Sequence, residues 1–468
     1  MDEELFFESA ARLAIRMRQH EVSPVEFTHA LIKRINASEL NAYCTVCADE
    51  AVSAAKKAEV LLHSGAFDAQ AQPLLGVPVS VKDNIETAGI RTTYGSRVFA
   101  NNIPEADAVC VQRLKAAGAI IVGKTNLPEF ATKGVVDSPL LGVTRNPWDL
   151  GRVVGGSSGG AAAAVAAGLG PIAVGNDQAG SIRMPAALCG VAGIKPTSGR
   201  IPFAPNLSPW DQLFQVGVIA RSVDDLELGL RVLEGHHADD PLSYPVSDGP
   251  SSPTHTGSRP RIAWSSTIGF ARIEPEILGI VQTALASLDA FGDVAGVDLD
   301  LSPAPIAYSI LVPFKRAIEV GHHLDAWAEQ MDPEVVAYIR LGQSMGVNEV
   351  RTGLEARTRV YVEIERLFRD HDFLVTPTLS VAAFEIGLTG PSEINGVKTT
   401  SFRDWFPYTY PFNLSGHPAV SIPAGFTSKG LPVGIQIVGP RFSDRAVLAL
   451  ARALESVRPW AAAHPPFT

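Results

Sequence analysis

The chain has 468 residues, of which 46% are hydrophobic and 19% are charged. A chain of this length buries roughly three quarters of the surface that it exposes when unfolded, so we expect a full hydrophobic core. Lysine and arginine total 39 against 49 aspartate and glutamate residues, a net charge of −10. This balance argues against a nucleic-acid partner, which requires a basic face, but it leaves room for a local basic pocket.

The cysteine content and the N-terminal sequence indicate the cellular compartment of the protein. Four cysteines are too few for a disulfide scaffold, and Cys44 and Cys47 have no second pair at zinc-site spacing, so we interpret them as small residues of a strand. The acidic N-terminus lacks a signal-peptide pattern. The longest apolar run, 161–175, contains Pro171 and is shorter than the ~20 residues that span a bilayer. We therefore expect a cytoplasmic protein without a membrane anchor.

The first 70 or so residues are predicted to be mainly helical. Ser23-Pro24-Val25-Glu26 has the pattern of a helix N-terminus, a capping box with proline at the first helical position. Residues 41–47 alternate weakly, as in a strand, and the pattern over 48–62 predicts another helix.

Beyond Gly76, strands and helices alternate. Val77, Val79 and Val81 indicate a short strand that ends at Lys82. The following segments continue the alternation: a helix over 107–117, a buried strand over 119–123, an alanine-rich helix over 160–168, and a strand over 171–175. This alternation predicts a mostly parallel sheet with helices on both faces.

The second half of the chain continues in the same style. Residues 245–260 are rich in proline and small polar residues and predict a surface loop. Helices are expected over 222–234, 274–291, 305–330 and 349–369, and strands over 261–264, 372–376 and 419–422. We expect one domain over 1–468, with a helical insertion at about 300–370.

Two serine-containing loops carry the chemical signal. Gly155-Gly156-Ser157-Ser158-Gly159-Gly160 precedes the alanine-rich helix, and its glycines allow close backbone approach. A second turn, Asp177-Gln178-Ala179-Gly180-Ser181, directly follows a buried strand. Consecutive backbone N–H groups in such a turn can bind an anion, with a serine beside them. This is the layout that acyl transfer requires, a nucleophile next to an oxyanion hole.

Three other kinds of site fit these residues less well. A phosphate-binding loop needs lysine and a hydroxyl after its last glycine, whereas four alanines follow Gly160. A nucleophile elbow with Ser158 matches G-x-S-x-G, but only Val153 and Val154 precede it as a strand. The 11 histidines are scattered, so we expect no metal site and no cofactor.

With these motifs, the sequence resembles the amidase signature family. The resemblance rests on GGSSGG at 155–160, GNDQAGSIRMPAALCGVAGIKPTSGR at 175–200, LLGVPVSVKDNI at 74–85 and GAIIVGKTNLPEFA at 118–131. Lys82 and Ser157 are 75 positions apart, and Ser157 and Ser181 are 24 apart, as in the family. The resemblance implies an α/β/α fold around a large twisted mixed sheet of about eleven strands.

The resemblance also implies a Ser–Ser–Lys triad. Ser181 would be the nucleophile, Ser157 the bridging serine held by a cis peptide bond, and Lys82 the base. Ala179 stands where the family usually has glycine, which costs strain of roughly 1–2 kcal/mol if φ there is positive. The oxyanion hole would consist of the backbone N–H groups of Gln178, Ala179, Gly180 and Ser181.

The triad requires a buried lysine. A lysine with its reference pKa near 10.4 is protonated at pH 7 and cannot act as a base, whereas burial lowers that pKa. Asp177 and Arg183 flank Ser181 and are expected to form a buried pair that holds the turn. Ser158 is expected to support its loop by hydrogen bonding. Two further charged residues of these motifs, Lys124 and Asp83, are interpreted as structural.

Substrate class is less determined by the sequence. Phe203, Trp210 and Phe214 lie in an irregular loop that is a candidate substrate pocket. A second candidate apolar wall comprises Phe402, Trp405, Phe406, Tyr408 and Tyr410. We expect a hydrolase of small aliphatic or aryl amides that also cleaves esters and carbamates and acts on small molecules only. The sequence is compatible with a homodimer.

One branch of the family is the catalytic subunit of the glutaminyl-tRNA amidotransferase, which carries an arginine-rich stretch that helps to hold glutamine. The comparable segment here, 338–343, reads YIRLGQ and lacks the paired arginines. The resemblance therefore favours the stand-alone amidase branch. The alternatives are the Ser158 esterase and the amidotransferase subunit.

Overall fold

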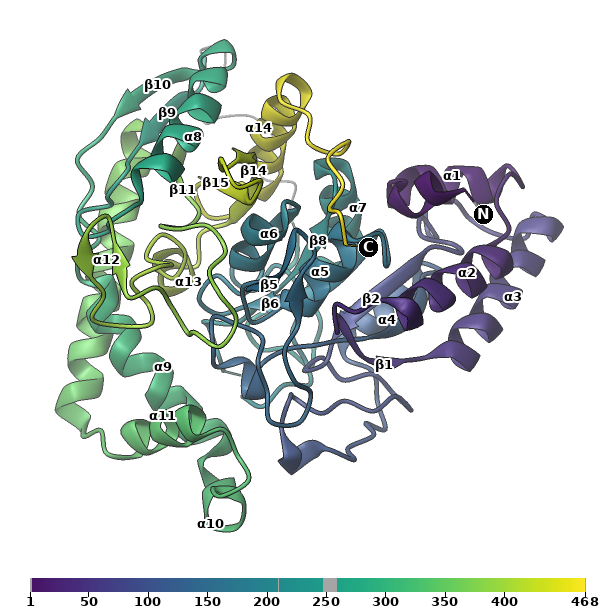
Figure 1. The fold of residues 1–468 in the computed structure, drawn as a ribbon, viewed down its shortest axis with the longest axis horizontal. Helices are drawn as coiled ribbons and strands as arrows, with labels where there is room; N and C mark the ends of the chain where they lie inside the picture. The colour runs from purple at the N-terminus through teal and green to yellow at the C-terminus, as the bar shows by residue number, and fades with distance from the viewer. Residues whose placement is uncertain (1, 209, 247–258, 468) are drawn as a thin grey trace.

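A computed structural model describes residues 2–208, 210–246 and 259–467. Its centre is a mixed sheet of eleven strands covered by helices, which confirms the expected fold class (Figure 1). In hydrogen-bonded order the strands are β1 (Tyr43–Val46), β3 (Ile120–Thr125), β2 (Pro78–Lys82), β6 (Ile172–Asp177), β8 (Gln215–Ala220), β7 (Ala192–Lys195), β14 (Ala419–Phe426), β15 (Pro432–Val438), β11 (Phe373–Pro377), β9 (Arg261–Trp264) and β10 (Asp293–Gly296).

The expectation of a mostly parallel sheet is wrong. β2 runs parallel to β3 and β6, and β9 runs parallel to β10 and β11, but the other neighbouring pairs of this sheet are antiparallel. β14 and β15 show the reason, because a short turn that needs no crossover helix joins them. Two short ribbons stand apart from the sheet, β4 (Arg145–Asn146) with β5 (Asp149–Val153) and β12 (Glu393–Ile394) with β13 (Val397–Lys398).

The helices expected after Ser23 and over 222–234 begin at serine caps. Ser23 accepts a hydrogen bond from the Glu26 N–H at 3.1 Å, and Ser222 accepts one from the Asp225 N–H at 3.2 Å. The helices are α1 (Ala10–Arg18), α2 (Pro24–Ala37), α3 (Ala48–Ser64), α4 (Val109–Ala116), α5 (Gly159–Ala166), α6 (Arg183–Cys189), α7 (Val223–Leu233), α8 (Pro275–Ala286), α9 (Ala304–Val320), α10 (Leu324–Trp327), α11 (Pro333–Gln343), α12 (Val347–Asp370), α13 (Pro411–Ser415) and α14 (Asp444–Val457).

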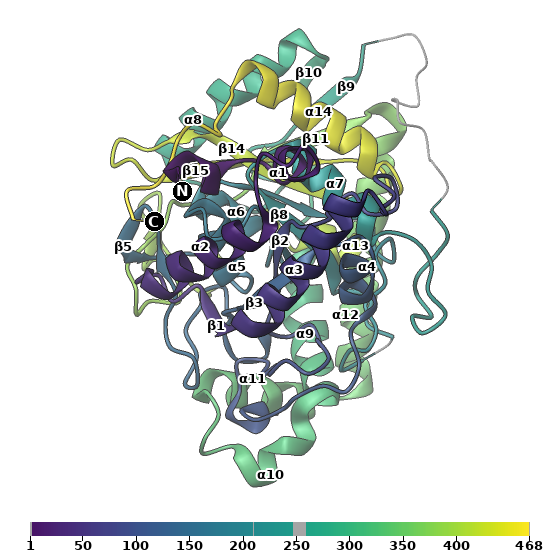
Figure 2. The same ribbon diagram turned by 90° about the vertical axis from the view of Figure 1, so that its right-hand side faces the viewer.

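Helices cover both faces of the sheet, as the alternation along β8 demonstrates. A Cβ on Gly217 would point at Ile182, which precedes α6, whereas the adjacent Val218 packs against Gly229 of α7. Successive residues of a strand point to opposite faces, so α6 and α7 lie on opposite sides. Figure 2 views the molecule from its N-terminal helices, with α3 packed against β3 and α2 beside α3.

Helices α9 to α12 lie between β10 and β11 in the chain, where a helical insertion was expected, and they gather at one side of the molecule (Figure 1). The loop expected at 245–260 lies mostly outside the described residues. Within the described ranges, none of the helices combines the length and the apolar character that crossing a bilayer demands.

Candidate active site

Lys82, the last residue of β2, is fully buried at the edge where β2 and β6 end. Its Nζ lies 2.7 Å from Ser157 Oγ and 2.8 Å from Asn176 Oδ1. Burial lowers the pKa of the ammonium group well below its ordinary value; nearby Asp177 opposes this shift and Arg316 adds to it. A lysine in this environment loses its proton more readily than a lysine in water.

Asn176 is a site residue that the sequence analysis missed, although it lies within a motif that was quoted. It occupies the end of β6 and is fully buried. Its side-chain amide donates to Asn84 Oδ1 at 3.0 Å, so its Oδ1 is held toward Lys82. Only the pairing of β2 with β6 brings these two side chains together, and no local signal in the sequence identifies it.

The Ser157 loop packs tightly enough to require its glycines. A Cβ on Gly156 would lie 2.8 Å from the carbonyl carbon of Gly134 and 2.9 Å from the Val135 nitrogen, which are backbone atoms that cannot move aside easily. The peptide bond between Gly156 and Ser157 is cis. Glycine at 156 therefore allows the loop to lie against the 134–135 backbone, with the Ser157 hydroxyl against Lys82.

Ser158 joins the two serine loops to each other. Its N–H donates to the Ser181 carbonyl at 3.0 Å, and its hydroxyl donates to the Asn176 carbonyl at 3.1 Å. Ser158 is fully buried, as expected for a supporting residue. A hydroxyl that is occupied in this way does not support the nucleophile-elbow alternative.

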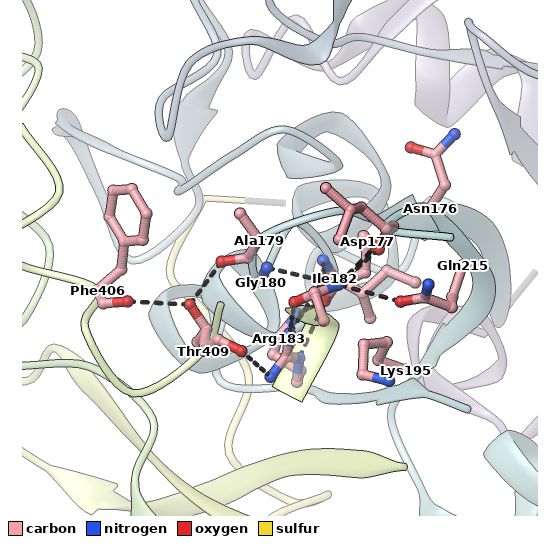
Figure 3. Close-up of polar contacts among 12 residues, drawn as sticks. Asn176, Asp177, Ala179, Gly180, Ile182, Arg183, Lys195, Gln215, Phe406 and Thr409 are labelled. Carbon is pink, nitrogen blue, oxygen red and sulfur yellow. Dashed lines mark hydrogen bonds and ion pairs between the residues drawn. The ribbon is translucent and has the colours of Figure 1, made fainter. Parts of the chain in front are cut away.

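Asp177 and Arg183 form a fully buried ion pair beneath the Ser181 turn (Figure 3). The carboxylate accepts from Arg183 Nη2 at 2.9 Å and Nε at 3.0 Å, and from the backbone N–H groups of Gly180 at 2.7 Å and Ile182 at 3.1 Å. Burial alone would raise the pKa of Asp177, but Arg183 and Asn413 outweigh it and hold that pKa far below its ordinary range. The pair therefore fixes the backbone on both sides of Ser181.

Counting the described residues alone, the backbone of the turn has three unpaired N–H donors rather than four. The N–H groups of Gln178, Ala179 and Ser181 have no hydrogen-bond partner among the described residues, whereas that of Gly180 is bound to Asp177. We therefore correct the expectation for Gly180 and leave its N–H out of the candidate oxyanion hole. Ala179 is not among the described residues with positive φ, so alanine is accommodated without the strain considered above.

Gly180 has a different role. Its φ is +115°, and a Cβ there would lie 2.4 Å from Thr409 Oγ1. The Thr409 hydroxyl donates to the Ala179 carbonyl at 2.6 Å and so holds the turn from the opposite side (Figure 3). Glycine is needed at 180 for conformation and for space.

Ser181 opens onto a small pocket between the serine turn, the 131–134 segment and α9. The residues that line this pocket are Ala131, Thr132, Lys133, Gly134, Gln178, Ala179, Ser181, Met184, Tyr308, Val312, Arg316 and Phe406. Tyr308, Val312 and Arg316 are spaced four residues apart along α9 and therefore share one face of that helix. Sequence analysis missed them, although the spacing is a readable signal once α9 is known to face the site.

Most of the aromatic residues expected in the pocket lie elsewhere. Phe203, Trp210 and Phe214 do not line it: Phe203 and Phe214 pack edge to face at 6.1 Å, and the Trp210 side chain is 72% exposed. The Phe214 ring also contacts Lys315, whose Nζ lies 4.1 Å from the ring centroid. From the second group only Phe406 reaches the pocket, whereas Trp405, Tyr408 and Tyr410 are buried in the core and Phe402 packs partly buried against it.

The chain belongs to the amidase family, whose model, described as "Amidase", matches residues 26–448. It is 35% identical to an acylamidase of Rhodococcus erythropolis, over 99% of this chain and 98% of that one. It is 36% identical to a subunit of the glutamyl-tRNA(Gln) amidotransferase of Moorella thermoacetica, over 97% of each. A crystal structure of a bacterial aryl acylamidase of the amidase signature family superposes with a TM-score of 0.90 and 28% identity, covering 97% of each chain. The protein is therefore an amidase, a hydrolase that acts on amides.

Proposed function

We propose that this amidase cleaves the C–N bond of small aliphatic or aryl amides through an acyl-enzyme at Ser181. The observation that carries the proposal is the buried contact of 2.7 Å between Lys82 Nζ and Ser157 Oγ, in a loop that Ser158 ties to Ser181. A lysine with a lowered pKa and a serine in contact with it form a base that can act on a neighbouring hydroxyl.

In the first half of the reaction, neutral Lys82 donates one N–H to Asn176 and offers its lone pair to the Ser157 hydroxyl. Ser157 passes its proton to Lys82 and takes the proton of Ser181, whose oxygen attacks the substrate carbonyl carbon. The protons then return along the same route to the leaving nitrogen, so the C–N bond breaks and the amine departs neutral. Water, activated in the same way, cleaves the acyl-enzyme and restores Ser181.

The negative charge that develops on the substrate oxygen needs donors in place. The backbone N–H groups of Gln178, Ala179 and Ser181 are available for that purpose, and the Asp177–Arg183 pair holds their backbone rigid. Removal of a single such donor costs typically about 10²–10³ in kcat in other enzymes, so three donors account for a large part of the barrier reduction.

The substrate range follows from the pocket and the relatives. Met184, Tyr308, Val312 and Phe406 give the pocket an apolar wall, which suits an aliphatic or aryl group. The resemblance to an aryl acylamidase supports the same class. We also propose cleavage of esters and carbamates, because an alkoxide leaves more easily than an amine and a carbamate presents the same carbonyl.

Hydrolysis of an acyl 4-nitroanilide by the purified chain tests the assignment. Ser181→Ala and Lys82→Ala should each lower kcat by at least about 10³-fold. A fluorophosphonate should label Ser181, with the adduct located by mass spectrometry. Retained activity in Ser181→Ala, or a label on another serine, would refute the proposed nucleophile.

A second candidate function is transamidation as a subunit of a tRNA-dependent complex, which the 36% identity to an amidotransferase subunit favours. The absence of paired arginines at 338–343 argues against it. The two functions separate in one assay, because a stand-alone amidase turns over the anilide without ATP or a partner protein, whereas a dependent subunit needs them.

A further inference from the structure

The pocket at Ser181 contains two buried hydrogen-bond donors that the proposed mechanism does not use. Gln178 and Arg316 both line this pocket and are 5% and 2% exposed. Gln178 Nε2 and Arg316 Nε each lack a hydrogen-bond partner among the described residues. Buried polar groups are rarely left unpaired, since each costs about 1–3 kcal/mol. Two such donors in the lining of this pocket point to an acceptor on the substrate.

The orientation of the Gln178 amide is determined by its neighbour. Arg316 Nη2 lies 3.4 Å from Gln178 Oε1, and a guanidinium can only donate. The oxygen of the amide must therefore face Arg316, which leaves its NH₂ group as the unpaired end. Both unpaired atoms are thus donors, so the group that satisfies them must be an acceptor.

The charges around Arg316 indicate that this acceptor is neutral. Glu319 pairs with Arg316 Nη1 at 3.0 Å and with Lys315 at 2.8 Å, and Asp211 pairs with Lys315 at 2.8 Å. Two cations thus face two carboxylates. The other cation of the pocket, Lys133, lies 2.5 Å from Asp332. With these charges compensated, an additional carboxylate would gain little attraction while losing its hydration.

We propose that Gln178 and Arg316 form a specificity site that binds a second carbonyl oxygen of the substrate, so that preferred substrates are amides carrying a further neutral amide or ester group. This inference rests on the proposed function, because it places the second carbonyl in the pocket of Ser181. The apolar face of Tyr308 and Val312, which lie two turns and one turn before Arg316 on α9, would contact the chain between the two carbonyls.

Matched anilides test the proposal, and those that vary the acyl group are 4-nitroanilides. Acetylglycyl and pentanoyl anilides have the same main-chain length, but only the first carries a second carbonyl; glutaryl anilide places a carboxylate at the far end. A second pair, acetyl-β-alanyl and hexanoyl anilides, covers a longer spacing. Placing the groups on the amine side, as 4-acetamidoanilide and 4-propylanilide, covers the other direction.

In the wild-type enzyme, kcat/KM should favour the second-carbonyl compound about tenfold in at least one pair, as expected for hydrogen bonds to buried donors. The glutaryl compound should be poorer than the acetylglycyl compound. Ratios near one in every pair, or a preference for the carboxylate, would overturn the proposal. If no anilide is cleaved at all, the proposed function fails instead.

Arg316→Met should reduce the preferred ratio to about one to three. Lys315 still pairs with Glu319 in this variant, so the carboxylate keeps a partner. Arg351→Met, an exposed arginine on α12, is the matched control and should keep the wild-type ratio. A wild-type ratio in a folded, active Arg316→Met enzyme would show that the two donors bind water rather than substrate.

Discussion

Replacement of Asp177 by asparagine should break the buried ion pair that holds the Ser181 turn in place. Asparagine has nearly the same shape, but it puts an NH₂ group in place of one accepting oxygen. Oδ1 accepts from the Gly180 N–H and Arg183 Nη2, and Oδ2 accepts from the Ile182 N–H and Arg183 Nε. It also leaves Arg183 fully buried without its counter-charge. The N–H groups of Gly180 and Ile182, on either side of Ser181, would no longer share a carboxylate as their hydrogen-bond acceptor.

Loss of the ion pair should lower both the free energy of unfolding and the Tm. Breaking a fully buried, hydrogen-bonded ion pair costs about 3–5 kcal/mol. With an unfolding entropy of about 2.1 cal/mol/K per residue, a chain of 468 residues should lose about 3–5 °C in Tm. The folded-state pKa of Asp177 is lowered, so the contribution of the pair is present above the unfolded pKa of about 3.9 and is lost as the pH falls below it.

Scanning calorimetry and anilide kinetics measure the two effects, and we expect kcat to fall about 100-fold because the turn is displaced. Asp224→Asn is the matched control, since Asp224 pairs with Arg452 at the surface with side chains 69% and 39% exposed. Such a pair contributes about 0.2–1 kcal/mol, so its loss should shift Tm by less than about 1 °C. An equally small shift for Asp177→Asn would refute the reasoning.

Three further predictions concern the triad and its support. Because Lys82 must be neutral to act, kcat/KM should fall as the pH is lowered through a pKa well below the ordinary lysine value, and a midpoint near 10.5 would contradict this. The control variant Lys195→Met removes another buried lysine, whose pKa burial lowers to about 7, and should leave the midpoint unchanged. Gly180→Ala should lower kcat/KM at least 100-fold and destabilise the fold by about 2–3 kcal/mol, seen by kinetics and thermal unfolding, because its Cβ would meet Thr409 at a φ that alanine avoids; a wild-type Tm would argue against it. Ser158→Ala should retain fluorophosphonate labelling and lose about tenfold or less in kcat, whereas abolished labelling would favour the elbow alternative.

Much of the site could be predicted because its residues lie in short, specific motifs. The two serine loops, the lysine at a strand end and the Asp177–Arg183 pair all depend on local sequence patterns. The helix cap at Ser23 was predicted for the same reason, since a cap depends on residues within one turn.

The prediction of the aromatic pocket was wrong because the presence of aromatic residues in a segment does not determine whether their rings face the active site or the core. Phe203 and Phe214 pack against each other, and Phe406 alone of the candidates lines the pocket at Ser181. The antiparallel strands were missed because the order and direction of strands depend on pairings between distant segments.

The residue types within short motifs were enough to indicate the family, the three triad candidates and the need for glycine around them. The packed fold was needed to learn that Asn176 orients Lys82, that the Gly180 N–H donates to Asp177, and that α9 brings Arg316 to Gln178. Those contacts join segments up to 138 residues apart, and they form only when the sheet and its covering helices pack together.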